Sequence, residues 1–585
     1  MTRPHRILAA AFVSFVAMGA SSQPPVSRPA TLRVGMWTLW HDREIALTPT
    51  ASTMLQTCEP CEKRVLHNAA TVGANQHGGL TLLVGEHTMQ VRAIRLSGGV
   101  TLTAHSESAT LRDRVTITAR GGTLVIAVTM PVERYVEHVV ASESGLEDST
   151  ESLKALAIVV RTYALHESHG HPDYDLCDST HCQLLHWHSD PHRSPAAHEE
   201  TLATAGETLW FHGRRAIAYF SKDCGGRTAS LAEIWPHVDS APYLDSHTDK
   251  FCTKESGGWS SELTRTELTS ALASRGLAAP GWQHLSVEHR GESGRVVTLR
   301  LDSITIHAED FRIAVGESLG WNKVPSTWFE VSQQGDRFFF HGRGTGHGVG
   351  LCQKGAAAMA AQGRSSHEIL TQYFSGAATA DESTGKSWQS LARAGFTLET
   401  QNASDAPFLA DLARARAEAS ERSGFNPSQP FTVRAFPSTS AFRDATLAPG
   451  WTAAFTEGDW IATQPLATLA ARHLLLPTMR HEFLHALIEH EAGPRAPLWL
   501  REGLVELWST DPDAWTNLRP RTPVMALDAV DAALLHSTTE AQSRAAHRDA
   551  AIYVLRLLDG YGRAQALEWI RSGVPADALA RIGQR

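Results

Sequence analysis

The sequence lacks a high density of charge, a long basic run and any long hydrophobic run beyond its N-terminus. Charged residues make up 20% of the 585 residues, and the net charge is −9. These values exclude a largely disordered chain and argue against a nucleic-acid partner. No later window holds about 18 uninterrupted apolar residues, so no ordinary membrane span is expected there. The apolar fraction of 42% predicts a folded, soluble chain, and its length predicts two or three domains.

Cysteine is also scarce, with seven in the whole chain. Two of them fall in a His/Cys cluster, and the remaining five are Cys58, Cys61, Cys224, Cys252 and Cys352. Cys224 with Cys252, or Cys58 with Cys61, could form a disulfide, but the sequence does not assign the connectivity. Because five is odd, at least one thiol is expected to stay free.

The N-terminus has the pattern of an export signal. Arg3 and Arg6 precede an apolar run over residues 7–18, and small residues follow it. We therefore expect residues 1–20 to be a signal peptide and the mature protein to be periplasmic or extracellular. The alternative is a short N-terminal anchor that is not cleaved.

The sequence pattern of the rest of the chain predicts a multidomain α+β protein. Short apolar runs alternate with turn residues from about Leu32 to Met130, which predicts a β-rich N-terminal part. Helices are predicted over 132–140 and about 149–165, a hairpin over 207–220 and further strands over 284–312.

A change in amino-acid composition near residue 380 divides the chain. Residues 376–390 are small and polar, as in a linker. We expect a first domain over 25–377, a linker over 378–394 and a mainly helical α+β domain over 395–585. The second domain begins with an amphipathic helix over 408–423.

A glutamate and two cations mark a first candidate site. Glu143 follows an apolar helix and precedes a glycine turn, so it could act as a general acid whose pKa is raised by partial burial. The alternative is a surface or capping glutamate. Lys154 and Arg161 are seven residues apart on one face of the next helix, where we expect them to line the cleft. The alternative is a solvated helix face.

A cluster of residues with the spacing of metal ligands follows this helix in the sequence. Two imidazoles and two thiols within twelve residues suit tetrahedral zinc in a closed structural site. The four ligands are His171, Cys177, His181 and Cys182, with His169 and His186 in reserve. The alternative is a Cys177–Cys182 disulfide with bystander histidines.

Several separate blocks occur in an order that resembles the SpoIID/LytB family, also called stage II sporulation protein D or amidase enhancer. They include LKALAIVVRTYAL (153–165), AYFSKDCGGRTAS (218–230) and the glycine-rich block 342–374. The resemblance spans about residues 30–377. It implies a lytic transglycosylase that cuts the MurNAc–GlcNAc β-1,4 bond of peptidoglycan glycan strands and leaves a 1,6-anhydro end.

The same resemblance implies roles for individual residues. Glu143 matches the family's catalytic glutamate, although Ser-Glu-Ser stands where that family usually has Ala-Glu-Met or similar. Some members of the family carry zinc at the loop that holds the His/Cys cluster. Four further residues fall in matching blocks and are candidate sugar contacts or structural residues: Tyr163, Ser221, His347 and Gln353.

A second metal motif begins at residue 481. In HEFLH, His481 and His485 lie one helical turn apart, and Glu482 between them is placed to act as a general base. Glu502, seventeen residues after His485, supplies a third ligand and leaves one coordination position open, as in catalytic zinc sites.

This motif resembles a gluzincin-type metallopeptidase of the peptidase MA-like group, over about residues 395–585. The resemblance implies a peptide or protein substrate, and the strand 460–463 is a candidate edge strand for binding it. Tyr553 and His547 are candidate groups for stabilising an oxyanion. The alternative is a metal-binding pseudoenzyme or a wall-docking module.

The sequence therefore predicts an exported cell-wall enzyme with a structural and a catalytic zinc. Two alternatives give the first domain a role other than catalysis. The first domain could only bind glycan and stimulate a separate amidase, or it could serve as a targeting module for the metallopeptidase.

Overall fold

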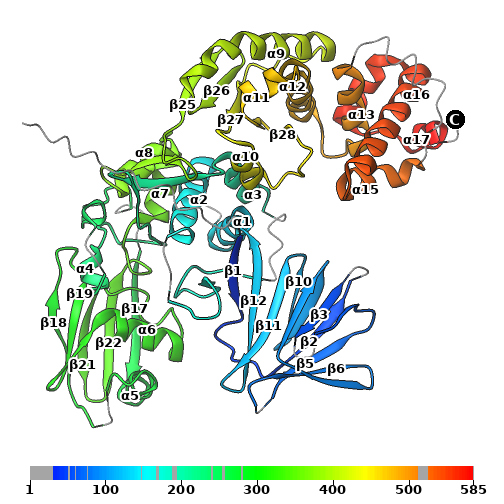
Figure 1. Ribbon diagram of the computed structural model, residues 1–585. Helices are drawn as coiled ribbons and strands as arrows, with labels where there is room; N and C mark the ends of the chain where they lie inside the picture. The colour runs from blue at the N-terminus through cyan, green and yellow to red at the C-terminus, as the bar shows by residue number, and fades with distance from the viewer. Residues whose placement is uncertain are drawn as a thin grey trace, which may run out of the picture.

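The computed structural model describes residues 31–583 except 51–52, 59–60, 76, 146–147, 167–169, 188–193, 239–240, 253–256, 279–280, 511–522 and 524. The predicted signal peptide, residues 1–20, lies outside the described residues. The multidomain α+β class is confirmed: β-sheets come first, a mixed centre follows and helices dominate the C-terminal part (Figure 1). Within the described residues, none of the helices has the length and apolarity that a membrane crossing requires.

The N-terminal part is a pair of packed β-sheets. Its strands are β1 (Thr31–Met36), β2 (Glu44–Pro49), β3 (Met54–Cys58), β4 (Lys63–Val65), β5 (Ala70–Ala74), β6 (Leu80–Val84), β7 (His87–Val91), β8 (Ala93–Ser97), β9 (Val100–Ala104), β10 (Glu107–Leu111), β11 (Arg114–Arg120) and β12 (Thr123–Pro131). One sheet has the order β13-β1-β12-β11-β8-β3-β4, where β13 is Leu176–Cys177, and the other has the order β10-β9-β2-β5-β6-β7. Buried residues alternate along most strands, so the two apolar faces meet in one core.

The centre of the molecule is built around a buried helix, α2 (Thr150–Ala164). A capping box between Ser149 and Ser152 begins it, and nearly all of its residues are buried. It packs against α1 (Val132–Glu143), α3 (Pro195–Ala203), α7 (Gln353–Ala361) and α8 (Ser366–Tyr373). The two helices predicted from the sequence at 132–140 and 149–165 are confirmed.

Short elements complete this central part. They are β14 (Glu207–Phe211), β15 (Arg214–Arg215), β16 (Phe220–Ser221), α4 (Leu231–Ile234), the 3₁₀ turn η2 (Pro242–Leu244), β23 (Leu351–Cys352) and β24 (Ala378–Asp381). The predicted hairpin is β14–β15, with positive φ at both turn residues, His212 and Gly213. Strands β16 and β23 pair in parallel, and Ser221 lies opposite Cys352.

A unit with its own core is inserted between η2 and β23. It contains β17 (Gly258–Thr264), α5 (Arg265–Ser274), β18 (Leu285–Arg290), β19 (Val296–Leu301), β20 (Ile304–His307), α6 (Ala308–Leu319), β21 (Phe329–Gln334) and β22 (Arg337–Arg343). Two three-stranded sheets and the two helices enclose a separate apolar cluster. The sequence predicted only additional strands here, and the helix α6 begins inside the predicted strand region.

The C-terminal part combines a five-stranded sheet with helices. The strands are β25 (Gln389–Arg393), β26 (Phe396–Thr400), β27 (Phe431–Ala435), β28 (Ala454–Glu457) and β29 (Trp460–Thr463), in the order β25-β26-β27-β29-β28. The helices are η3 (Ala403–Phe408), α9 (Leu409–Ser423), α10 (Thr439–Thr446), α11 (Leu466–Ala471), α12 (Leu475–Glu491), α13 (Leu498–Ser509), α15 (Leu527–His536), α16 (Glu540–Ser572) and α17 (Ala576–Gly583). The predicted helix at 408–423 is confirmed as α9.

The predicted linker at 378–394 is not a free connection. β24 pairs with β14 of the central part, and β25 pairs with β26 of the C-terminal sheet. A buried apolar cluster also joins Leu202 and Ala205 to Phe436 and Phe442. Small polar residues therefore form strands here because both neighbouring sheets offer unpaired edges.

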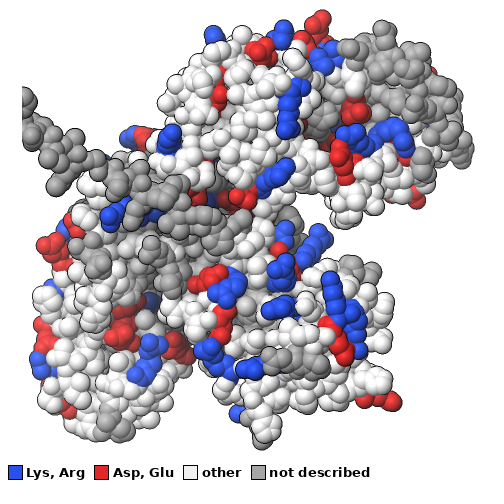
Figure 2. Space-filling model, in the orientation of Figure 1, with Lys and Arg blue, Asp and Glu red and all other residues white. Residues whose placement is uncertain are grey.

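The described acidic and basic side chains are interspersed on the face that Figure 2 shows.

Candidate active sites and metal clusters

Glu143 is the last residue of α1 and is half-buried. Burial raises the pKa of its carboxyl to about 7, although the charge of Lys222 and a hydrogen bond from the Leu184 backbone N–H oppose that rise. Gln353, the first residue of α7, donates from Nε2 to the Glu143 carbonyl oxygen at 3.2 Å. A carboxyl with a pKa near 7 can give up a proton and recover it at neutral pH.

The loop around Leu184 is attached to α1 next to this carboxyl. Ser142 Oγ accepts a hydrogen bond from the His186 backbone N–H at 3.0 Å and donates to the His138 carbonyl at 2.7 Å. The Ser-Glu-Ser sequence therefore contributes a serine that fixes the neighbouring loop. His186, a reserve zinc ligand in the sequence analysis, is tied to Ser142 through its backbone.

The two predicted cleft cations have other partners. Arg161 has an exposed fraction of 0% and pairs with Glu133, with 2.5 Å between Nη2 and Oε2. Lys154 is half-buried and pairs with Glu151 at 3.0 Å and Glu200 at 3.7 Å. The prediction that Arg161 lines a cleft is wrong, because α2 is surrounded on all sides and not only on one face.

Lys222 is the cation that sequence reasoning missed. Its charge acts on Glu143, and its side chain is exposed. The only signal was its position in AYFSKDC, next to the candidate Ser221.

The four candidate sugar contacts are not equivalent. Gln353 donates a hydrogen bond to the Glu143 carbonyl oxygen. Ser221 is buried, and its Oγ has no hydrogen-bond partner among the described residues. Tyr163 is also buried and packs edge-on against Tyr219, with 5.8 Å between ring centroids.

His347 has the contacts of a structural histidine. Its ring lies against Trp235 and Tyr219, with centroid distances of 4.9 Å and 6.1 Å. Its Nδ1 accepts the Val349 backbone N–H at 3.0 Å. Burial lowers its pKa to about 4, so the ring is neutral at physiological pH.

The predicted His/Cys cluster is assembled in the structure. One ligand atom from each of its residues lies within 4.8 Å of all the others: His171, Cys177, His181 and Cys182. Cys182 Sγ is 3.2 Å from His171 Nε2, and both thiols are 3.7 Å from His181 Nδ1. The two sulfurs are 2.9 Å apart, whereas a disulfide bond measures about 2.05 Å.

These donors fit a zinc ion. Two thiols and two imidazoles are the soft ligand set of closed tetrahedral sites. A hydrogen bond from Cys182 lowers the pKa of the Cys177 thiol well below its ordinary value, which favours the thiolate that a metal binds. Cys182 is two residues before Leu184, so this cluster anchors the loop that contacts Glu143.

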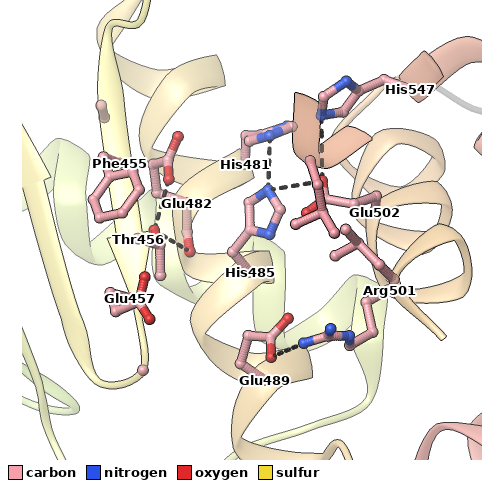
Figure 3. Close-up of a pocket in the computed structure, with 14 residues that line it drawn as sticks. Phe455, Thr456, Glu457, His481, Glu482, His485, Glu489, Arg501, Glu502 and His547 are labelled. Atoms are coloured by element: carbon pink, nitrogen blue, oxygen red, sulfur yellow. Dashed lines mark hydrogen bonds and ion pairs between the residues drawn. The ribbon is translucent and has the colours of Figure 1, made fainter. Parts of the chain in front are cut away.

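The second motif brings its two histidines together and places Glu502 near one of them. Helix α12 carries His481 and His485, whose Nε2 atoms are 3.1 Å apart, and α13 brings Glu502 to 3.7 Å from His485 Nε2 (Figure 3). Burial and the charge of His485 lower the pKa of His481 to about 3. Burial alone would raise the pKa of Glu502, but the charge of His485 and a hydrogen bond from His547 lower it to about 2. A neutral imidazole and an ionised carboxylate are both forms that bind metal.

Glu482 points from α12 toward the edge strand β28. Its Oε2 accepts a hydrogen bond from Thr456 Oγ1 of β28 at 2.6 Å (Figure 3). Burial raises the pKa of Glu482 above its ordinary value, despite the opposing charge of His485 and this hydrogen bond. A carboxyl with a raised pKa is suited to receive a proton near neutral pH.

These groups line a cavity of about 470 Å³. Its walls come from β28, α12, α13, α15 and α16, and they include Thr456, Glu457, Arg501 and His547. His547 Nε2 lies 3.3 Å from Glu502 Oε2, while its Nδ1–H donates to the Ser543 carbonyl at 2.8 Å.

Two expectations for this site are corrected. The strand at 460–463 is β29, an interior strand, and the edge strand that lines the cavity is its antiparallel neighbour β28. Tyr553 does not line the cavity, because its hydroxyl donates to the Met525 carbonyl at 2.8 Å. His547 does line it.

Comparison with known proteins gives two family matches. Residues 120–211 match the family described as stage II sporulation protein (SpoIID). Residues 252–350 match a domain of unknown function, DUF8618, which corresponds to the inserted unit with its own core. Both matches end by residue 350, so the interpretation of the C-terminal cavity rests on its own geometry.

Three curated proteins are similar over part of the chain. An uncharacterized protein of Brachyspira hyodysenteriae is 27% identical over 257 residues, covering 43% of this chain and 68% of that protein. Stage II sporulation protein D of Bacillus subtilis is 27% identical over 273 residues, covering 42% and 74%. The amidase enhancer of Bacillus subtilis is 23% identical over 291 residues, covering 41% and 39%.

Proposed function

We infer that this chain is an exported cell-wall enzyme with two catalytic centres. The first, at Glu143, cleaves the MurNAc–GlcNAc β-1,4 bond of peptidoglycan glycan strands and leaves a 1,6-anhydro end. The observation that supports it best is a carboxyl with a pKa of about 7 inside the segment that matches the stage II sporulation protein family. The second, at Glu482, hydrolyses peptide bonds.

One carboxyl is enough for the first reaction. Glu143 in its protonated form gives its proton to the glycosidic oxygen while the C1–O bond breaks. The resulting carboxylate then takes the proton of the sugar's own 6-hydroxyl as O6 bonds to C1. Glu143 thus recovers its proton, and no water is consumed. Lys222 and the Leu184 N–H stabilise the carboxylate between the two steps.

The test is the release of anhydro-muropeptides from denuded glycan strands. Glu143→Gln is expected to lower the rate by at least about 100-fold, the usual scale of general acid catalysis. Glu86→Gln, in an exposed turn between β6 and β7, is the matched control and should cleave like the wild type. Mass spectrometry of the digest measures both. Undiminished cleavage by Glu143→Gln would remove this residue from the mechanism.

A non-catalytic role is the second candidate for this part. One similar protein carries the name amidase enhancer, which favours a glycan-binding domain that stimulates a separate cell-wall amidase. Under that alternative the purified chain releases no 1,6-anhydro ends, and it raises amidase turnover whether residue 143 is Glu or Gln.

The cavity at Glu482 supports a zinc peptidase. His481, His485 and Glu502 would hold the ion, which supplies a Lewis acid for the scissile carbonyl. Glu482 takes a proton from the attacking water and gives it to the leaving amine, and Thr456 holds its carboxylate in place. An extended peptide can pair with the edge strand β28, which lines the cavity.

The test of the second centre separates chemistry from metal binding. Glu482→Gln is expected to abolish proteolysis while the zinc content stays at the wild-type value, because Glu482 is not a ligand. His485→Gln should lose both. Glu421→Gln, exposed on α9, is the control. A Glu482→Gln variant that still cleaves peptides would leave this cavity as a docking or pseudoenzyme site.

Metal removal distinguishes the two centres in one preparation. Mild chelation should stop peptide cleavage, since the zinc of an open catalytic site exchanges more readily than that of a closed one. Glycan cleavage should persist under the same conditions. Loss of both activities together would make the first part a targeting module for the peptidase.

A further inference from the structure

A third group of metal-binding side chains lies outside both candidate sites. Its members are each 0% exposed, and their ligand atoms all lie within 4.8 Å of one another: Cys224, Asp249, Cys252 and Cys352. The sequence had suggested only a Cys224–Cys252 disulfide as one option, but all three thiols are free. We propose that these four residues bind one Zn²⁺ in a closed structural site.

Distant segments of the chain bring the four donors together. Cys224 follows β16, and Cys352 ends β23, the strand that pairs with β16 in parallel. Asp249 and Cys252 come from the turn that leads into the inserted unit. A cluster made from three segments is not explained by local sequence spacing, and a bound ion would join all three.

Two of the four donors are oriented by hydrogen bonds from their surroundings. Asp249 Oδ1 accepts the backbone N–H groups of Phe251 and Cys252 at 3.0 and 3.1 Å, and Oδ2 accepts the Tyr373 hydroxyl at 2.8 Å. Cys352 Sγ accepts the backbone N–H groups of Cys224 and Gly355 at 3.2 and 3.4 Å. Such outer contacts fix the ligands of metal sites.

The backbone also approaches the cluster unusually closely. A Cβ on Gly355, in the first turn of α7, would lie 2.5 Å from Asp249 Oδ2 and 2.1 Å from the Tyr373 hydroxyl. Only glycine fits there. The space around Asp249 is therefore shaped for a carboxylate held in one position.

A buried cation balances the charge that such a site would carry. Three thiolates and one carboxylate around Zn²⁺ leave a net charge of −2. Arg295 of the inserted unit is 0% exposed, donates from Nη2 to the Cys224 carbonyl at 2.8 Å and interacts electrostatically with Cys224 and Cys352. Its Nε and Nη1 have no hydrogen-bond partner among the described residues. A guanidinium buried with unpaired N–H groups is costly unless negative charge lies beside it, and here Glu309 and Glu233 supply such charge together with the cluster.

Other charged groups also face the cluster. Asp223 Oδ1 is 3.1 Å from Cys252 Sγ, and its carboxylate is held by the Gly225 N–H at 2.7 Å and by Lys354 at 3.4 Å. Lys354 thus offsets the carboxylate nearest to the sulfurs.

The donor set selects zinc over other common ions. Three soft sulfurs with one oxygen favour Zn²⁺ over Ca²⁺ and Mg²⁺, which prefer oxygen alone. Four protein ligands leave no open position, so the ion would stabilise structure and not perform chemistry. Sulfurs about 2.3 Å from one ion lie about 3.8 Å from each other in a tetrahedron, within the observed limit of 4.8 Å.

The site would hold two residues beside Glu143. Lys222 is two residues before Cys224, and Gln353 directly follows Cys352. One ion would therefore fix the two segments that present a cation and an amide to Glu143. The metal assignment itself does not depend on what Glu143 catalyses.

The experiment is zinc counting on the full chain by inductively coupled plasma mass spectrometry. Cys352→Ser is expected to lose about one equivalent of zinc relative to the wild type. Cys58→Ser, which alters a half-buried thiol outside both clusters, is the control and should lose none. A wild-type zinc content in Cys352→Ser would overturn the proposal, as would a Cys224–Cys252 disulfide found by peptide mapping of the protein as isolated.

A second measurement covers the case in which Cys352→Ser does not fold. Both thiols of the other cluster are replaced by serine (Cys177→Ser with Cys182→Ser), and the protein is loaded with Co²⁺. Strong thiolate-to-cobalt charge-transfer absorption should remain, because three thiolates of the buried site still bind. Absence of that absorption would overturn the proposal.

Discussion

At the scale of single residues, the position of Glu143 explains its high pKa. Burial of the carboxyl raises the pKa, and Lys222 with the Leu184 N–H restrains the effect. The residue also ends α1, and the partial negative charge of a helix C-terminus disfavours a carboxylate. A catalytic acid that must later act as a base needs this balance, because an unrestrained rise would leave it protonated throughout.

Replacement of Lys222 tests this balance. Lys222→Met removes a charge that lowers the pKa of Glu143, so that pKa should rise above about 7. The protonated acid then persists to higher pH, and the alkaline limb of the glycan-cleavage rate should move upward, by up to about one unit. A pH–rate profile measures the shift.

Lys63→Met is the matched control, because Lys63 is exposed on β4 in the N-terminal sheets. Its alkaline limb should stay in place. If the alkaline limb of the pH–rate profile does not move in Lys222→Met either, a group other than Glu143 controls it.

At the scale of elements, the loop from residue 170 to residue 187 connects the His/Cys cluster to the first site. Asp178 accepts hydrogen bonds from the Trp37 backbone N–H at 2.5 Å and the Trp187 indole at 2.8 Å, which ties the loop to the N-terminal sheets. Leu184 then reaches Glu143. A metal held by this cluster would therefore act on Glu143 through the loop and not through contact with substrate.

Loss of the cluster should weaken catalysis without unfolding the molecule. Cys182→Ser is expected to lower the zinc content by about one equivalent and to expose the loop to proteases, since a metal clip no longer closes it. Glycan cleavage should fall about 10- to 100-fold, the usual cost of lost metal-site support. Zinc counting, limited proteolysis and the cleavage assay measure the three effects.

The matched control for this element is Cys61→Ser, an exposed thiol in the N-terminal sheets. It should leave all three measurements unchanged. Full cleavage activity in a zinc-depleted Cys182→Ser protein would show that the loop holds Glu143 without metal.

At the scale of the whole molecule, buried contacts hold the central and C-terminal parts together. Arg434 of β27 pairs with Glu207 of β14 at 2.6 Å, and both side chains are almost fully buried. His198 of α3 lies 3.0 Å from Glu137 of α1 and 3.8 Å from Glu457, which lines the cavity at Glu482. The two candidate sites therefore belong to one continuous structure.

Breaking the buried ion pair should make the central and C-terminal parts unfold at different temperatures. Arg434→Leu leaves Glu207 buried without its strongest partner, at a cost of about 3–5 kcal/mol. Calorimetry should show the C-terminal part unfolding at a lower temperature in the variant. Arg414→Leu, which removes an exposed pair with Asp411, should cost less than about 1 kcal/mol.

The effect of Arg434→Leu should also depend on pH. Burial would raise the pKa of Glu207, but Arg434, His367 and Arg161 together outweigh it and hold that pKa below its ordinary value. A depressed pKa contributes stability above the unfolded pKa of about 4.3 and loses it as the pH falls. The difference in the free energy of unfolding between wild type and variant should therefore become smaller in acid. An equal difference in the free energy of unfolding at pH 7 and pH 3 would contradict the conclusion that Arg434 lowers the pKa of Glu207.

The sequence by itself determined the features that depend on local spacing. Turn residues and alternation predicted the N-terminal sheets, and the HEFLH spacing alone placed two histidines on one helical turn. The His/Cys cluster also lies within twelve residues, so one loop can assemble it. Short-range patterns suffice when the interacting groups are close along the chain.

Only the tertiary structure decided which side chains meet across long separations. Arg161 and Lys222 look alike in sequence, yet packing around α2 buries the first against Glu133 and leaves the second beside Glu143. The Cys224–Cys352 neighbourhood spans 128 residues and an inserted unit, and the 378–394 segment became strands because neighbouring sheets had edges to pair. Such contacts depend on how whole elements pack, which no local pattern of residues records.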